Sequence, residues 1–146
     1  MREIIFRGKR IDNGEWVEGG LISIDLETYD AAEKIKYTHC IVEPNVEFYR
    51  GEIGGFEFVN PETVGQFTGL TDRNGKRIFE GDIIRKGFEC FVVKWNSNQC
   101  RWGLFDKHYF EVVGFNEHTK NYLEIIGNIY DNPELLNEIN EREGRE

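Results

Sequence analysis

The sequence has few of the residues that mark secreted domains or membrane proteins. Its three cysteines are odd in number and show no Cys-x-x-Cys spacing, so a disulfide framework is not expected. The first ten residues, M-R-E-I-I-F-R-G-K-R, hold an apolar run of only three residues, too short for a signal peptide or a membrane span. These absences favour an intracellular, cytoplasmic protein with no membrane segment.

Patterns of nucleophilic catalysis and phosphate binding are also missing. The only two serines, Ser23 and Ser97, lie outside any G-x-S-x-G pattern. The run Gly69-x5-Gly75-Lys76 is one residue too long for a phosphate loop, and an arginine stands where a magnesium-binding hydroxyl is needed. A thiol–imidazole pair of Cys90 and His108 is the alternative to a core thiol and a surface imidazole. We therefore expect a protein that is not an enzyme, and an enzyme would need these groups to converge in a deep pocket.

Metal-ligating residues do not cluster in the sequence. His39 and Cys40 are adjacent, so on a strand they would point to opposite faces. No other histidine or cysteine has the short ligand spacing of a structural zinc site, and we expect no metal and no cofactor. Carboxylate pairs, either Asp72 with Asp82 or Glu80 with Asp82, suit acid–base chemistry, but roles in a hairpin turn and at a strand edge also explain them.

What the sequence does contain is aromatic side chains and short alternating segments. Phe, Tyr and Trp make up 14% of the chain, which suits a β-rich core. Alternating apolar residues between Gly and Asn turn signals predict strands at 4–6, 15–18, 21–26, 35–43, 64–70, 78–84, 88–95, 100–105, 109–114 and 122–126. Strands at this spacing favour a mainly β fold, either a small barrel or a sandwich.

The most distinctive stretch runs from Thr63 to Ile84 and reads as strand, turn and strand. Asp72-Arg73-Asn74-Gly75 forms the turn, because Asn and Gly tolerate the positive φ angles of hairpin turns. An earlier hairpin between Phe6 and Gly19 shares the pattern F-x-G-x4-N-G. Internal duplication and common turn chemistry both explain this similarity.

These residues also carry a family resemblance. The run V-G-Q-F-T-G-L-x-D-x-N-G-x-x-I-x-E-G-D-I resembles the signature of the YopX family, small proteins encoded by phages and prophages of bacteria. Gly127–Leu135 resembles the closing motif of that family and Arg2–Arg7 its opening, whereas residues 20–60 match poorly. The resemblance implies a part similar to an SH3-like barrel. It implies no biochemical activity and no catalytic residue.

Together these observations predict three regions. Residues 1–61 form an N-terminal β segment with an acidic loop, since positions 43–62 hold five glutamates and one arginine. Residues 62–130 form the SH3-like barrel. Residues 131–146 form a short helix, with Asn132 as its cap and Pro133 in its first turn, followed by a charged tail.

A basic hairpin tip is the first candidate binding surface. Five basic and three acidic side chains between 63 and 87 give this window a net charge of +2. The rest of the chain carries a net charge of −11, and the two add to the total of −9. Arg73, Lys76 and Arg77 lie at its turn. Affinity for DNA comes largely from many phosphate contacts, so weak nucleic-acid binding is the alternative function, and a solvated turn is the simpler explanation.

A group of aromatic residues is the second candidate surface, formed by Trp95, Trp102 and Tyr109. Packing in the core explains these side chains, but if they are exposed they would line a groove for an extended peptide. We therefore expect a phage or prophage accessory protein that binds another protein, from host or phage, or its own copies as a homo-oligomer through hairpin edges. The net charge of −9 serves solubility or presents an acidic surface to a basic partner.

Overall fold

The computed structural model describes residues 2–23, 39–43, 48–49, 52–53, 56–108, 110–114, 116, 118 and 120–136. The chain separates into two compact units, Met1–Gln66 and Phe67–Glu146. Both are built from antiparallel strands, which confirms the mainly β prediction. Helical structure in the described part of the chain is limited to the 3-10 turns η2 (Pro61–Thr63) and η3 (Lys120–Tyr122) and a short helix at 134–136. No helix among those residues is long and apolar enough to cross a membrane.

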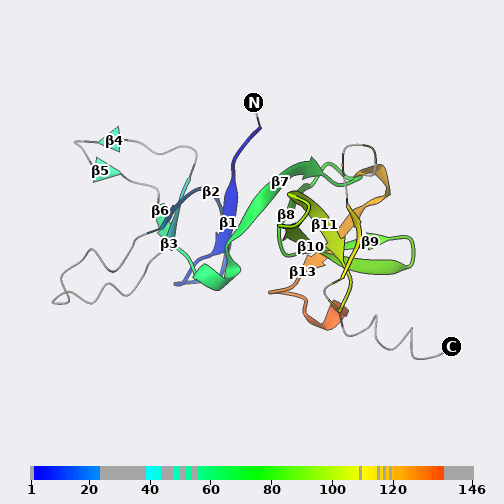
Figure 1. Cartoon of the computed structure of the whole chain (residues 1–146). Helices are drawn as coiled ribbons and strands as arrows, with labels where there is room; N and C mark the ends of the chain where they lie inside the picture. Colours follow the sequence, from blue (N-terminus) through cyan, green and yellow to red (C-terminus); the bar gives the residue numbers. More distant parts are fainter. Residues whose placement is uncertain are drawn as a thin grey trace. The chain divides into compact units, whose positions relative to one another are not determined.

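The first unit is a sheet in which the strand order is β6-β3-β2-β1 (Figure 1). The first residues of β7 (Gly65–Thr71) continue this order by pairing with β1, where Phe6 lies opposite Gln66. Strands β4 and β5 pair only with each other in the described residues. The strand bounds are β1 (Phe6–Lys9), β2 (Trp16–Ser23), β3 (His39–Val42), β4 (Phe48–Tyr49), β5 (Glu52–Ile53) and β6 (Phe56–Phe58).

Two strand predictions in this unit are corrected. Strand β1 begins at Phe6, because Ile4 is exposed and forms no ladder. The strands expected at 15–18 and 21–26 are one strand, β2, which runs through Gly19 and Gly20. A Cβ atom at Gly19 would overlap the backbone carbonyl of Val42, so this glycine permits close approach of β3 rather than a turn. Residues 24–38, which include parts of two predicted strands, lie outside the described residues.

The acidic loop predicted at 43–62 is structured at its C-terminal end. Strand β6 and η2 occupy most of residues 56–63, and Val59 between them is fully buried. The hydroxyl of Thr63 accepts a hydrogen bond from the Lys9 N–H at 2.9 Å and donates one to the Asn60 carbonyl at 2.7 Å. The prediction of a loop is therefore wrong for residues 56–62, because their apolar side chains and the adjacent buried Thr63 fasten them to β1 and β3.

The second unit contains a five-stranded antiparallel sheet and a hairpin. The strand order of the sheet is β12-β11-β10-β9-β13, and the hairpin pairs the rest of β7 with β8. The bounds are β8 (Arg77–Phe79), β9 (Asp82–Lys86), β10 (Glu89–Asn96), β11 (Arg101–Phe105), β12 (Glu111–Gly114) and β13 (Glu124–Asn128). Because the order begins with β12 and ends with β13, the described strands do not form a closed barrel. The last strand begins two residues later than predicted, since η3 occupies 120–122.

One apolar cluster forms the core of the second unit. Its buried members are Ile78, Ile84, Phe91, Val93, Leu104 and Leu123. Val113 from β12 and Ile125 from β13 pack against this same cluster, although their strands are the two edges of the sheet. The sheet is therefore curved around its core, and Figure 1 shows β8 to β11 and β13 gathered there.

The predicted turn at 72–75 is confirmed, and it is fastened to the last strand. Gly75 has a φ angle of +80°, which only glycine adopts without strain. Asp72 is 4% exposed, and its Oδ1 accepts hydrogen bonds from the N–H groups of Asn74 and Lys76, both at 2.9 Å. Its Oδ2 accepts a third from the Ile125 N–H at 3.0 Å. One buried carboxylate thus closes the hairpin turn and joins it to β13.

The closing motif is organised by a second buried polar side chain. The Asn128 Oδ1 atom accepts hydrogen bonds from the N–H groups of Tyr130 at 3.0 Å and Asp131 at 2.9 Å. Its Nδ2 donates to the Asp131 carboxylate at 3.0 Å. The Oδ1 of Asn132, which was expected to cap the helix, instead accepts from the Asn128 N–H at 3.2 Å. The Asn132 side chain therefore does not cap the helix, because its amide oxygen bonds back to the last residue of β13.

The central and closing motifs contact each other. The Ile129 N–H donates to the Gly81 carbonyl at 2.9 Å, and a Cβ atom at Gly81 would lie 3.2 Å from the Tyr130 ring. Gly81 has a φ angle of +89°, so both space and backbone conformation require glycine there. The neighbouring carboxylate of Asp82 is buried and accepts a hydrogen bond from the Phe79 N–H at 2.8 Å. These residues therefore hold the architecture of the second unit together.

Candidate binding groove

An open groove of about 720 Å³ lies on the second unit, with its lining drawn from several separate segments. The turn of the β7–β8 hairpin, the turn between β9 and β10, strand β12 and η3 all contribute to it. Its lining includes the side chains of Arg73, Lys86, Glu89, Val112, Val113 and Tyr122. Its volume falls within the range of about 300–1,000 Å³ that is typical of ligand sites.

The groove has apolar walls that face solvent. Tyr122 is 69% exposed and Val112 is 53% exposed. Val113 and the buried Phe91 also line the groove and belong to the core, so the floor of the groove is the outer side of that core. Large exposed side chains in a concave surface are typical of binding sites rather than of ordinary solvated surface.

Three charged side chains surround these walls. Arg73, Lys86 and Glu89 are all exposed, which gives the lining two positive charges and one negative charge. The charge of Arg73 also reaches Glu124: the pKa of that carboxyl is lowered chiefly by a hydrogen bond from Arg85, and further by the charges of Arg85 and Arg73. The Arg85 guanidinium holds this carboxylate at 2.6 Å. The groove is therefore locally cationic on a chain of net charge −9.

The basic hairpin residues are all exposed, but they have different neighbours. Arg73 lines the groove. The Arg77 guanidinium lies 5.6 Å from the centre of the Phe67 ring, a cation–π contact. Lys76 takes part in the turn through its backbone, which pairs with Asp72. Of the three predicted binding residues, the structure places only Arg73 in the groove.

The predicted aromatic surface is divided in the same way. Trp95 and Trp102 are paired across β10 and β11, with ring centres 5.2 Å apart and planes at 74°. Trp95 is exposed, whereas Trp102 is partly buried and packs against the core cluster. Neither lines the groove. Tyr109 lies outside the described residues.

Sequence reasoning missed Lys86, Val112 and Tyr122, and it also missed the exposure of Phe88. Phe88 is 97% exposed and stands between two residues of the groove lining, Gly87 and Glu89. Its position after Lys86-Gly87 was a usable signal, since a turn exposes its side chains. The exposure of Tyr122 was missed because the sequence pattern assigned this residue to the last strand, where an aromatic side chain is expected to be buried.

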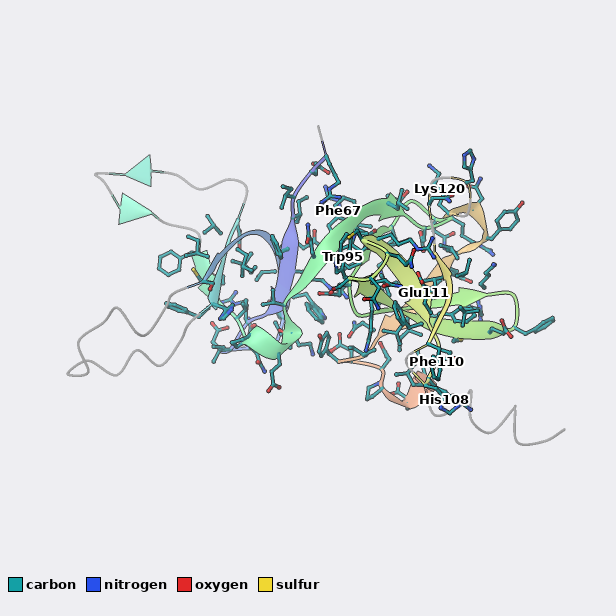
Figure 2. The ribbon with its side chains drawn as sticks, in the orientation of Figure 1. Phe67, Trp95, His108, Phe110, Glu111 and Lys120 are labelled. Atoms are coloured by element: carbon teal, nitrogen blue, oxygen red, sulfur yellow. The ribbon has the colours of Figure 1, made fainter. Side chains whose placement is uncertain are left out.

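A polar network holds the edge strand β12 beside β11. Glu111 accepts hydrogen bonds from the Arg101 Nε at 3.2 Å and from the Asn96 Nδ2 at 2.7 Å (Figure 2). The Arg101 hydrogen bond is the largest cause of the lowered pKa of the Glu111 carboxyl, which the Asn96 bond lowers further. Phe110, the residue before β12, is exposed. This network fixes the strand that forms one wall of the groove.

Among the described residues, the two members of the predicted thiol–imidazole pair differ in exposure. Cys90 is half-buried in β10, whereas His108 is exposed in the loop after β11. Burial raises the pKa of the Glu80 carboxyl, and the positive charge of Lys94 opposes that shift. Burial also lowers the pKa of the Lys94 ammonium, which the charge of Glu80 opposes. Within the described ranges, no group of three His, Cys, Asp or Glu side chains is placed to hold a metal ion.

Comparison with known proteins identifies the relatives of this fold. The family model described as YopX protein matches residues 5–137. No curated protein matches the chain. Among solved structures, the crystal structure of protein EF1440 from Enterococcus faecalis is similar, with 22% sequence identity and a TM-score of 0.56. The similarity covers 93% of this chain and 99% of EF1440, and at this identity it shows the fold alone.

Proposed function

The chain belongs to the YopX family, and from this premise we propose that it is a phage or prophage accessory protein, not an enzyme, that binds another protein. The partner is a host or phage protein, or a second copy of this chain, in the cytoplasm of the bacterial host. The groove carries this proposal, because exposed Val112 and Tyr122 beside charged side chains suit a protein contact. We further propose that the curved sheet of the second unit is a variant of an SH3-like barrel.

The buried carboxylates support a role in binding rather than in catalysis. Asp72 and Asp82 accept hydrogen bonds from backbone N–H groups, so their oxygens serve the fold. The groove, by contrast, combines apolar walls with exposed charges, which are the components of a protein-binding surface. Recognition of a partner needs only these components.

An affinity pull-down from host lysate tests this proposal. Tagged full-length protein is compared with the double variant Val112→Ser/Tyr122→Ser and with Ile22→Ser, a control at an exposed apolar residue of the first unit. Half of each lysate is treated with nuclease, and retained proteins are identified by mass spectrometry. We expect a specific partner that survives nuclease, is lost with the double variant and is kept by the control. Sedimentation velocity of the same three proteins detects self-association.

Two outcomes would contradict the proposal. Retention that the double variant leaves unchanged would show that the groove is not the contact surface. Retention that disappears with nuclease would favour nucleic acid over protein. Circular dichroism of each variant checks that the fold is intact, which is expected because both substituted side chains are mostly exposed.

The second candidate function is weak nucleic-acid binding, favoured by the exposure of Arg73, Lys76 and Arg77. Fluorescence anisotropy of a labelled oligonucleotide at low salt measures it. Replacing the three residues by Glu abolishes binding if they contact phosphates, and added salt weakens it. An oligonucleotide affinity that the triple variant leaves unchanged would remove this candidate.

A further inference from the structure

We infer that the groove binds an extended, acidic segment of the partner protein. In this arrangement carboxylates of the segment pair with Arg73 and Lys86, and one of its apolar side chains lies between Val112 and Tyr122. The inference rests on the proposed function, since it specifies the kind of partner segment that the same groove takes.

The shape of the groove favours an extended segment. Strand β12 lines one wall and begins the strand order of its sheet, so among the described residues its ladder is with β11. An edge strand presents backbone N–H and C=O groups with which a peptide can pair. The groove is also open, and residues of both β12 and η3 line it. A segment along β12 would place alternate side chains towards Val112 and Tyr122.

The charge of the lining favours acidic residues in that segment. Arg73 and Lys86 come from two different hairpin turns and lie in one lining with a single carboxylate, Glu89. The carboxylate of Glu124, whose pKa the charge of Arg73 also lowers, is already held by Arg85 at 2.6 Å. At physiological salt, charges more than about 8 Å apart are largely screened. The short-range cations of the groove therefore decide selectivity, although the chain as a whole carries −9.

The same lining is poorly suited to a nucleic acid. Tyr122 offers a ring on which a base could stack, but stable binding of a phosphate backbone draws on many positive charges. Two cations next to Glu89 supply few of them. A peptide with one or two carboxylates matches this number of charges, so an acidic protein segment is the better fit.

Peptide selection tests the inference directly. A phage-displayed library of random dodecapeptides is selected on the full-length protein, on Arg73→Glu/Lys86→Glu and on the control Lys76→Glu. Lys76 is an exposed cation of the same turn as Arg73 and does not line the groove. We expect wild type and control to enrich peptides with Asp or Glu beside an apolar residue. The double variant is expected to enrich peptides with Lys or Arg instead.

Affinity measurements follow on one selected acidic peptide. The double charge reversal is expected to weaken its binding by about tenfold, because each reversal replaces an attraction with a repulsion. The Lys76→Glu control is expected to change it by less than about threefold, which is the scale of a distant surface charge. Val112→Ser/Tyr122→Ser is expected to weaken the binding of every selected peptide, whatever its charge.

Several results would overturn the inference, and they separate it from the proposed function. Selected peptides without an acidic bias, or with a bias that the double reversal leaves unchanged, would overturn it. So would a labelled oligo-dT that binds more tightly than any peptide. If a partner is still captured from lysate through Val112 and Tyr122 in these cases, the proposed function stands alone. If that capture also fails, both are wrong.

Discussion

Removing the carboxylate of Asp72 is expected to destabilise the second unit far more than a surface substitution would. In Asp72→Ala three backbone N–H groups lose a charged acceptor: those of Asn74, Lys76 and Ile125. A hydrogen bond to a charged group contributes about 1.5–3 kcal/mol. The donors of Asn74 and Lys76 lie in an exposed turn, where water replaces the lost acceptor, so the total is about 3–5 kcal/mol.

Urea unfolding measures this change in the free energy of unfolding. The measurement is made in a Trp16→Phe background, so that fluorescence reports Trp95 and Trp102 of the second unit. Asp106→Ala is the matched control. The Oδ1 atom of Asp106 accepts hydrogen bonds from the backbone N–H groups of His108 and Phe110, in a loop open to solvent, and its loss is expected to cost about 1 kcal/mol.

The loss of unfolding free energy in Asp72→Ala is compared with the loss in Asp106→Ala to test whether the buried carboxylate stabilises the second unit. A loss below about 1 kcal/mol for Asp72→Ala, or one no larger than that of Asp106→Ala, would refute it. It would mean that the turn and β13 hold together without the buried carboxylate.

Three further predictions concern other parts of the second unit. Gly81→Ala lowers stability by about 2 kcal/mol in thermal unfolding, because the backbone φ of +89° strains an alanine and its methyl group contacts the Tyr130 ring. The control Gly87→Ala has a φ of +63° but open space around the methyl group, and it costs about 1 kcal/mol. Burial raises the folded-state pKa of Glu80, so the wild-type protein loses stability as the pH rises from the ordinary Glu pKa through that raised value. Glu80→Gln lacks this titration and is therefore more stable than the wild type at neutral pH and equally stable below this pH window. Urea unfolding at a series of pH values measures the difference. Phe88→Ser changes the free energy of unfolding in urea by less than about 0.5 kcal/mol, since the side chain is 97% exposed.

The turns and most of the strands of the chain could be predicted from the sequence. The Asn-Gly turns and the strands after the central hairpin agree with the structure, with errors of two residues or fewer at most ends. The single strand predicted at 78–84 is wrong, because a turn at Glu80-Gly81 divides it into β8 and β9, which pair with different neighbours. These elements depend on interactions between neighbours in the chain, such as the Asp72 side chain bonding to the N–H groups of Asn74 and Lys76. Alternation did not mark the core in the same way, because consecutive residues such as Ile83 and Ile84 of β9, or Phe91 to Val93 of β10, are all buried.

Features that depend on residues far apart could not be read in this way. The glycines at 19 and 20 separated two predicted strands, but the structure has one strand there, and Gly19 permits the close approach of β3. The groove brings together Arg73, Lys86, Val112 and Tyr122 from four segments, and no spacing in the sequence relates them. Whether an aromatic side chain is core or surface follows from the curvature of the sheet, which the strand pattern does not specify.

The contact between the central and closing motifs also affects how genetic data on this protein should be interpreted. Asp72 and Gly81 each accept a hydrogen bond from a backbone group of a distant segment, and Asn128 does so within the closing motif, so their substitution lowers the amount of folded protein in the cell. A mutational scan scored on phenotype alone would therefore find its strongest losses at these structural residues, which do not line the groove. Dividing each phenotype by the measured protein abundance would reveal the residues that meet the partner.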